Sequence, residues 1–229
     1  MTSPARDRAL IFDVDGTLVD SNDAHAAAWA DALRESDVLR DARTIRPFIG
    51  KGSDKLLPEV AGLSADGERG RHVTERRGAI FRDVYLPRLR PFPGVRALFE
   101  RLERDGVRRA IASSAAADEL DLLLNVAEIA DLVPHRTSAD EVDASKPDPD
   151  VVEAALARLD REAPLDRRAA LFVGDTPYDV EAAHRAALGV IAVRCGGWGD
   201  ADLTGARAIF EDPAALLAHY EAHGLPWER

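Results

Sequence analysis

The chain has almost no cysteine and no long apolar run, and each absence excludes a class of protein. Among its 229 residues, Cys195 is the single cysteine, so no internal disulfide can form. No stretch approaches the roughly 18 consecutive apolar residues that predict a membrane-spanning helix. The opening residues, MTSPARDRAL, hold no apolar segment of the kind that predicts a secretory signal. We therefore expect a cytoplasmic protein that works without a membrane partner.

The chain has fewer basic than acidic residues, with 30 lysine and arginine residues against 41 aspartate and glutamate residues, and its formal net charge is −11 at pH 7. A uniformly acidic surface repels nucleic acid and anionic lipid, which argues against both as partners. Residues 41–90 are the exception, with eleven lysine and arginine residues against seven aspartate and glutamate residues. This basic segment could attract a small anion, or it could be a solvated helical face, and charge alone favours the second interpretation.

The apolar pattern predicts a parallel α/β sheet that is interrupted by one helical block. The run RALIFDV at residues 8–14 is typical of a buried strand and is followed by a turn. Up to LRPFPGV at 89–95 we expect helices only, at about 22–36, capped by Ser21 or Asn22, and at about 65–86. Alternating strands and helices follow, which indicates a sheet that is covered on both faces. The strands are expected at 107–113, 132–136, 169–175, 189–195 and 206–211, and the helices at 95–104, 118–126, 149–159, 178–187 and 212–223, the last capped by Asp212.

Polar residues gather at the predicted strand ends. In open α/β sheets, ligands bind beyond the carboxyl ends of the strands, so we expect these residues to converge on one edge of the sheet. They are Asp13, Asp15, Gly16 and Thr17 after the first strand, Ser113 and Ser114 after the second, Lys146 in the loop SKPDPD, and Asp175 and Asp179 after the fourth.

This set of residues suits phosphate chemistry with a hard cation. Neighbouring carboxylates repel one another, and Mg²⁺ with its preference for oxygen ligands relieves that repulsion. Asp13 and Asp175 are the natural pair of ligands, and Lys146 can balance the charge of a nucleophile and a phosphate. Phosphate oxygens can also accept hydrogen bonds from the Ser113 hydroxyl and from the amides around Gly16 and Ser114.

One carboxylate of the set can react while another moves protons. An aspartate can attack phosphorus, and a second carboxyl group nearby can serve as acid and base. Asp13 and Asp15 point in different directions if the chain turns at Gly16, so they can divide these tasks. Each motif alone has a structural explanation, such as a turn or a helix cap. All of them in this order favour the catalytic interpretation.

The motifs DVDGT, Ser113, Lys146-Pro147 and GDTPYD resemble the four motifs of the haloacid dehalogenase-like hydrolases, over nearly the whole chain. The resemblance implies a Rossmann-like, doubly wound core at 1–20 and 90–229, with an all-helical cap at 21–89. It implies that Asp13 is the nucleophile and Asp15 the general acid and base. It also implies that Mg²⁺ is held by the carboxylates of Asp13 and Asp175 and the backbone carbonyl of Asp15. Asp179 would orient a metal-bound water or Lys146, and Ser113 and Lys146 would hold the phosphoryl group.

The resemblance also separates branches of the family. Dehalogenases and the phosphonate-cleaving branch lack the second aspartate, so Asp15 argues against both. Sugar phosphomutases share the motif, the cap and a histidine placed as His25 is, but they carry polar residues where this chain has Ala115, Ala116 and Ala117. We therefore predict a phosphatase of a small phosphorylated metabolite, such as phosphoglycolate or a sugar phosphate. A sugar phosphomutase is the alternative, and a noncatalytic phosphate-binding protein is less favoured because the reacting groups are intact.

The loop FIGKGSDKLL at 48–57 is the expected place of substrate contact in the cap. Gly50 permits an unusual backbone path, and Lys51 can reach an anionic substrate. A loop that joins two helices and exposes a lysine is the alternative. His25 and Trp29 share one face of the first cap helix, where we expect His25 to approach the site and Trp29 to pack in the core.

Overall fold

The computed structural model describes residues 8–227. The first seven residues, which include most of the stretch examined for a signal, and the last two residues of the predicted core lie outside this range. Among the described residues, no helix is both long enough and apolar enough to cross a membrane.

The described chain forms a sheet of six strands that all run in parallel, in the order β3-β2-β1-β4-β5-β6. The register of the strands pairs Phe12 of β1 with Ile111 of β2 on one side and with Val173 of β4 on the other. The strand ends that carry the first and fourth motifs therefore lie side by side. The strands are β1 (Ala9–Phe12), β2 (Arg108–Ala112), β3 (His135–Thr137), β4 (Ala170–Gly174), β5 (Gly189–Val193) and β6 (Ala208–Phe210).

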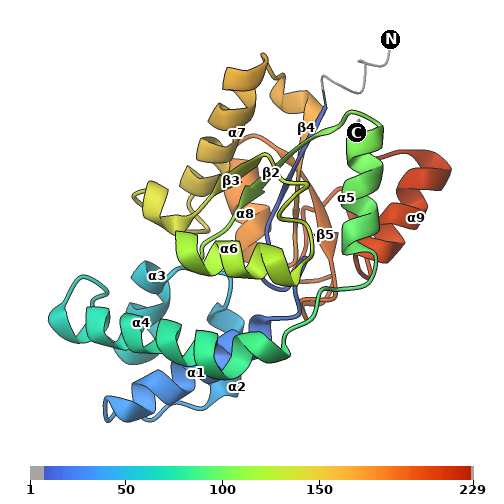
Figure 1. The fold of residues 1–229 in the computed structure, drawn as a ribbon. Helices are drawn as coiled ribbons and strands as arrows, with labels where there is room; N and C mark the ends of the chain where they lie inside the picture. The colour runs from blue at the N-terminus through green and yellow to red at the C-terminus, as the bar shows by residue number, and fades with distance from the viewer. Residues whose placement is uncertain (1–7, 228–229) are drawn as a thin grey trace.

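Both faces of the sheet are covered, which explains why β1, β4 and β5 are apolar throughout. Along β1, Leu10 and Phe12 belong to one apolar cluster, whereas Ala9 and Ile11 belong to another, as the alternation of side chains in a strand requires. The first cluster includes residues of α5 (Val95–Arg104), α6 (Ala117–Val126) and α9 (Pro213–His223). The second includes residues of α7 (Asp150–Glu162) and α8 (Pro177–Arg185). The predicted doubly wound parallel sheet is confirmed (Figure 1).

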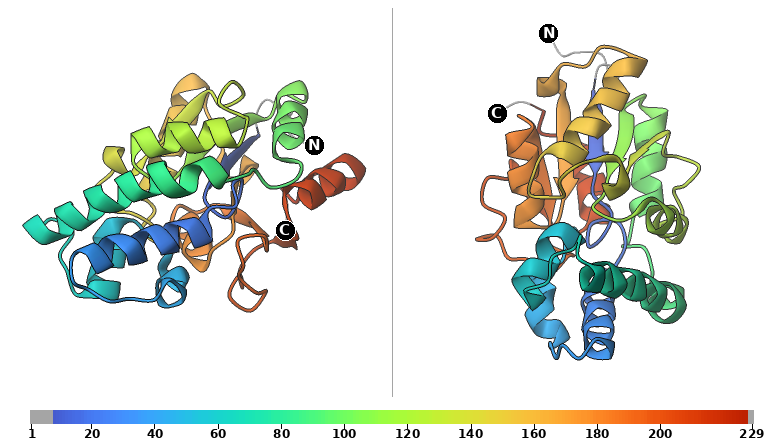
Figure 2. Two further views of the ribbon diagram at one scale, coloured as in Figure 1. Left: turned by 60° about the horizontal axis from the view of Figure 1, so that its bottom comes forward. Right: turned by 90° about the vertical axis from the view of Figure 1, so that its left-hand side faces the viewer.

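The chain between β1 and β2 is helical, and residues 21–89 contain no strand. The segment lies beyond the carboxyl ends of the strands, with α1 and α4 side by side (Figure 2). Its apolar residues, including Trp29 and Leu33, join the cluster that covers one face of the sheet. The segment comprises α1 (Asn22–Glu35), α2 (Ala42–Ile45), α3 (Ser53–Ala61), α4 (Glu68–Ile80), a π-helical turn at Phe81–Tyr85, and 3₁₀ turns at Arg46–Phe48 and Leu86–Arg88. Two further 3₁₀ turns follow in the core, at Ala139–Glu141 and Arg167–Ala169.

Three local predictions need correction. The strand expected at 132–136 begins only at His135, because Pro134 has no N–H to donate to a neighbouring strand. The helix expected at 65–86 is α-helical only from Glu68 to Ile80. The Ser21 side chain does not cap α1, since it donates to Asp15 instead. By contrast, Asp212 caps α9 as predicted, by accepting a hydrogen bond from the backbone N–H of Ala215 at 2.8 Å.

Candidate active site

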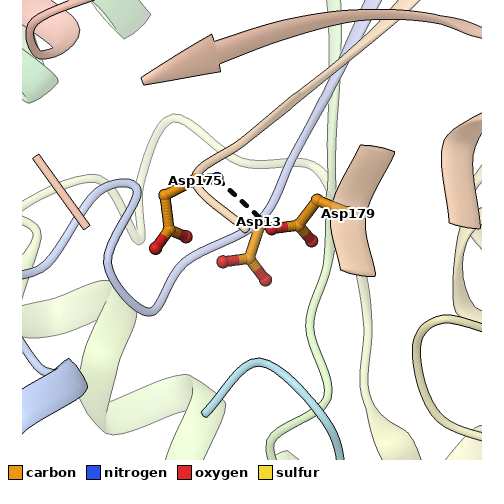
Figure 3. Close-up of side chains that lie close together, drawn as sticks. All are labelled: Asp13, Asp175 and Asp179. Atoms are coloured by element: carbon orange, nitrogen blue, oxygen red, sulfur yellow. Dashed lines mark hydrogen bonds between the residues drawn. The ribbon is translucent and has the colours of Figure 1, made fainter. Parts of the chain in front are cut away.

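Three buried carboxylates meet at the edge of the sheet where β1 and β4 end. Asp13 follows β1, Asp175 follows β4, and Asp179 lies in the first turn of α8 (Figure 3). Each offers a carboxylate oxygen, and these oxygens lie within 4.8 Å of one another. The backbone N–H of Asp13 donates to the carbonyl of Val173 at 2.9 Å, which carries the pairing of β1 and β4 into the site. The predicted convergence of the first and fourth motifs is therefore present.

Lys146 contacts two of these carboxylates. Its Nζ lies 2.5 Å from Oδ1 of Asp13 and 2.9 Å from Oδ1 of Asp179, and the side chain is fully buried. Burial would lower the pKa of Lys146, but the charges of Asp13 and Asp179 raise it above its usual value. The lysine therefore stays charged and neutralises part of the acidic group.

One lysine does not balance three carboxylates. Burial raises the pKa of Asp13 to about 7, helped by the charges of Asp179 and Asp15 and opposed by Lys146. Burial and the charges of Asp179 and Asp13 also raise the pKa of Asp175 well above its usual value. Carboxylates that are hard to ionise at close range fit a hard divalent cation, whose charge makes their ionised form favourable. The donor set of the site therefore fits Mg²⁺.

Asp179 is engaged by the protein through both oxygens. Oδ2 accepts hydrogen bonds from the backbone N–H of Asp175 at 3.2 Å and from the N–H and hydroxyl of Thr176 at 3.0 and 2.8 Å. Oδ1 faces Lys146. Asp179 is a buried member of the site rather than a solvated helix residue, and this arrangement fits the predicted role of orienting Lys146.

The turn after β1 brings Thr17 and Asn22 onto Asp175. Gly16 has a φ of +79°, and a side chain there would collide with Asn22 and Asp175. Thr17 Oγ1 donates to Oδ1 of Asp175 at 3.0 Å, and Asn22 Nδ2 donates to Oδ2 at 2.9 Å. The sequence pattern indicated Asn22 only as a candidate helix cap, so its role in holding Asp175 was missed.

Asp15 lines the same cavity as Asp13 but has different hydrogen-bond partners. Its Oδ1 accepts a hydrogen bond from Ser21 Oγ at 2.5 Å and lies 2.7 Å from His25 Nε2. Burial alone would raise the pKa of Asp15, but the charge of His25, the hydrogen bonds from His25 and Ser21, and the charge of Arg77 together lower it. His25 stacks on Phe81, with ring centroids 4.1 Å apart. The structure thus places His25 beside Asp15.

Arg77 and Glu119 form a pair that motif analysis did not single out. Nη1 of Arg77 donates to both carboxylate oxygens of Glu119, at 2.8 and 2.7 Å, and the guanidinium lies 5.0 Å from the centroid of the Trp29 ring. Glu119 is only 3% exposed. The pair joins α4 to α6 at the edge of the site. In the sequence, Arg77 belongs to a charged helix and carries no signal that separates it from its solvated neighbours.

The two predicted serines are placed differently. Ser113 is buried, and its Oγ accepts a hydrogen bond from the backbone N–H of Ala115 at 3.0 Å. The Ser114 hydroxyl is buried and has no hydrogen-bond partner among the described residues, and this residue lines a cavity together with Asp13 and Asp15. Ser113 does not line that cavity, so its contact with a phosphate remains a prediction.

Gly50 and Lys51 reach the site, but Lys51 already has a partner. Its Nζ donates to both oxygens of Glu59, at 2.7 and 2.9 Å, and lies 4.7 Å from the ring centroid of Tyr178. The side chain is 11% exposed, so the alternative of an exposed lysine in a joining loop is wrong. Gly50 packs against Thr176, where a side chain would come within 3.0 Å.

Two cavities lie between the helical segment and the core. A narrow one of about 40 Å³ is lined by Asp13, Asp15, His25, Gly50 and Ser114, among others. A larger one of about 290 Å³ lies beside it. Both are lined by Trp29, Lys51, Arg77 and Ser114. Asp13 and Asp15 therefore face a small space, and the larger cavity shares part of its lining.

Comparison with known proteins agrees with this geometry. The model of a family described as haloacid dehalogenase-like hydrolase matches residues 10–193. The chain belongs to this family. It is 32% identical over 190 residues to "Probable phosphatase IndB" of Dickeya dadantii, which covers 82% of this chain and 81% of the relative. It is 30% identical over 218 residues to a phosphoglycolate phosphatase of Rhodospirillum rubrum, and the match covers 91% of this chain and 89% of that relative.

A solved structure supports the same assignment. The crystal structure of a hydrolase from Pseudomonas syringae superimposes with a TM-score of 0.86 at 26% identity, covering 95% of this chain and all of that one. The fold of this haloacid dehalogenase-like hydrolase is thus shared over nearly the full chain.

Proposed function

We propose that this hydrolase is a Mg²⁺-dependent phosphatase that forms an aspartyl-phosphate on Asp13 and releases the phosphate of a small metabolite. The observation that carries the proposal is the contact of Asp13 with Lys146 beside buried Asp175, in a cavity that Asp15 and His25 also line. Mg²⁺, held by Asp13, Asp175 and the backbone carbonyl of Asp15, would supply positive charge to the phosphoryl oxygens.

In the first step, a carboxylate oxygen of Asp13 attacks phosphorus, a P–O bond forms, and the ester P–O bond to the leaving group breaks. The leaving oxygen takes a proton from Asp15. The lowered pKa of Asp15 favours its carboxylate, but an approaching phosphate dianion raises the pKa of a nearby carboxyl group, which lets Asp15 arrive protonated. Lys146 stabilises the negative charge that spreads over the phosphoryl group.

In the second step, the Asp15 carboxylate removes a proton from water, and the water oxygen attacks phosphorus. The bond between phosphorus and Asp13 breaks and releases inorganic phosphate. His25 Nε2, which lies 2.7 Å from Oδ1 of Asp15, fixes the position of the Asp15 side chain in the cavity. The two aspartates can therefore act in turn on the phosphorus atom.

We further propose that residues 21–89 act as a cap that selects a small leaving group. This segment supplies His25, Lys51 and Arg77 to the cavities, whereas the core supplies the reacting carboxylate. A cavity of about 290 Å³ accommodates a metabolite and excludes a phosphorylated protein. Phosphoglycolate is a candidate because the R. rubrum relative is named for it, and sugar phosphates are the other.

The test is hydrolysis of an aryl phosphate and of a metabolite panel, with and without Mg²⁺. Wild-type protein should release phosphate only with Mg²⁺, and Asp13→Asn should lose at least about 1,000-fold in kcat, because the nucleophile is absent. Asp66→Asn, an exposed carboxylate in the helical segment, is the matched control and should match wild type. Equal rates for wild type and Asp13→Asn would refute the mechanism. Conversion of a sugar 1-phosphate to its 6-phosphate with little phosphate release would assign a mutase instead.

A further inference from the structure

The loop that carries Lys146 is held from outside the core, by the residues that begin helix α3. Ser145 directly precedes Lys146 and is only 5% exposed. Its Oγ accepts a hydrogen bond from the backbone N–H of Gly52 at 2.9 Å and donates to Oδ1 of Asp54 at 2.5 Å. Its backbone N–H donates to Oδ2 of Asp54 at 3.2 Å, and its carbonyl accepts from Lys55 Nζ at 2.8 Å. The hydroxyl, N–H and carbonyl of one residue thus all contact residues 52–55.

Residues 52–55 and the loop at Ser145 are closely packed as well as hydrogen-bonded. A side chain at Gly52 would lie 2.6 Å from Cβ of Ser145, so only glycine allows this approach. Lys55 Nζ also lies 2.5 Å from Oδ2 of Asp148, on the far side of Lys146 in the chain. The contacts of residues 52–55 therefore bracket Lys146 on both sides.

We propose that Gly52, Asp54 and Lys55 form a clamp that positions Lys146 when the helical segment lies against the core, a proposal that rests on the proposed phosphatase activity. Lys146 must keep its Nζ near both Asp13 and Asp179, and a displacement of about 1 Å in such a group can cost about 100-fold in rate. The contacts to Ser145 exist only when the two parts of the molecule meet. Closure over the substrate and placement of the ammonium group therefore occur together.

Asp54 and Ser145 are accordingly positioning residues, because neither one contacts the reacting carboxylates. Both line the larger cavity, but their side chains are engaged with each other and with Gly52 and Lys55. A purely structural role at this interface would lower the melting temperature and leave kcat of the folded enzyme unchanged. A positioning role lowers kcat and leaves KM nearly unchanged, because Lys146 acts on charge that develops during the reaction.

The experiment compares Asp54→Ala, Asp54→Asn, Ser145→Ala and the double variant Asp54→Ala/Ser145→Ala. The matched controls are Asp66→Ala and Ser64→Ala, which change exposed residues of the same types. kcat and KM for an aryl phosphate are measured with saturating Mg²⁺. Hydrogen exchange of residues 143–149 is followed by mass spectrometry and needs no turnover.

We expect kcat of Asp54→Ala and Ser145→Ala to fall about 10-fold with less than about a threefold change in KM. Asp54→Asn keeps one acceptor for the Ser145 hydroxyl, so its kcat should fall less than that of Asp54→Ala. The double variant should resemble the more impaired single variant, because both changes remove the same contact. Exchange at 143–149 should be faster in these variants and unchanged in the controls.

Variants with wild-type kcat, losses confined to KM, or effects that multiply in the double variant would overturn the clamp. Unchanged exchange at 143–149 in Asp54→Ala would overturn it as well. If wild-type protein hydrolysed no ester, the proposed function would fail, and the exchange data alone would decide whether the clamp exists.

Discussion

Replacement of Gly16 by alanine tests the geometry of the site against a control within the same chain. Gly16 has a φ of +79°, and Gly62, which ends α3, has a φ of +67°. At either position alanine pays a conformational cost of about 1 kcal/mol or slightly more. The surroundings differ, because a Cβ at Gly62 has nothing within 4 Å, whereas one at Gly16 would lie 2.0 Å from Asn22 Nδ2 and 2.3 Å from Oδ2 of Asp175.

Alanine at Gly16 costs additional free energy of unfolding, because Asn22 or Asp175 must move. No atom can remain 2.3 Å from a Cβ, so the hydrogen bond from Asn22 Nδ2 to Asp175 must break or lengthen. A hydrogen bond to a buried charged group contributes about 1.5–3 kcal/mol. We therefore expect Gly16→Ala to lower the free energy of unfolding by about 2.5–4 kcal/mol and Gly62→Ala to lower it by about 1 kcal/mol.

Urea unfolding and aryl phosphate hydrolysis measure the two consequences. Gly16→Ala should lose at least about 100-fold in kcat, because Asp175 is displaced from Asp13, and Gly62→Ala should remain within about twofold of wild type. If both variants lost the same stability and retained activity, Asn22 and Asp175 would not lie where the structure places them.

Two further predictions follow from the charges of the site. The folded-state pKa of Asp13 is raised from 3.8 to about 7, so metal-free protein should lose stability as pH rises from about 4 to 7, by up to about 4 kcal/mol at about 1.4 kcal/mol per pKa unit. Mg²⁺ should raise the melting temperature more at pH 7.5 than at pH 5.5, since binding displaces that proton, and an equal rise at both pH values would contradict the assignment. Arg77→Met should lower the free energy of unfolding, measured in urea, by about 3 kcal/mol, because it leaves buried Glu119 unpaired. The same variant should lower kcat/KM about 10-fold. Arg76→Met, which breaks an exposed pair with Glu35, should cost under about 1 kcal/mol, and equal losses for the two variants would refute the role of Arg77.

The parts of the site that follow strands could be predicted from the sequence. Asp13 and Asp175 each end a buried apolar run, and parallel strands bring such ends to one edge of the sheet. The environment of Asp15 could be predicted only in part. Spacing indicated that His25 approaches the site, and it lies beside Asp15, but nothing in the sequence indicated the hydrogen bond from Ser21.

The contacts made by the helical segment could not be predicted in this way. Arg77 and Glu119 are 42 residues apart, and Asp54 and Ser145 are 91 residues apart. Periodicity identifies the helix on which Arg77 lies but does not fix how that helix is placed against the core. Lys51 illustrates the same limit at short range, because its pairing with Glu59 depends on the path of the loop before α3.

The two aspartates of DVDGT acquire opposite properties from different parts of the chain. Asp13 is surrounded by groups of the core, and its pKa is raised. Asp15 contacts Ser21 and His25 of the helical segment, and its pKa is lowered. These are the directions of the metal-free site, and the proposed roles need the opposite ones: Mg²⁺ would favour the Asp13 carboxylate, and an approaching phosphate would favour protonated Asp15. Because the same segment also brackets Lys146, it shapes two of the three groups that the proposed reaction needs. In the proposed reaction, the helical segment therefore sets the surroundings of the reacting groups as well as covering the substrate.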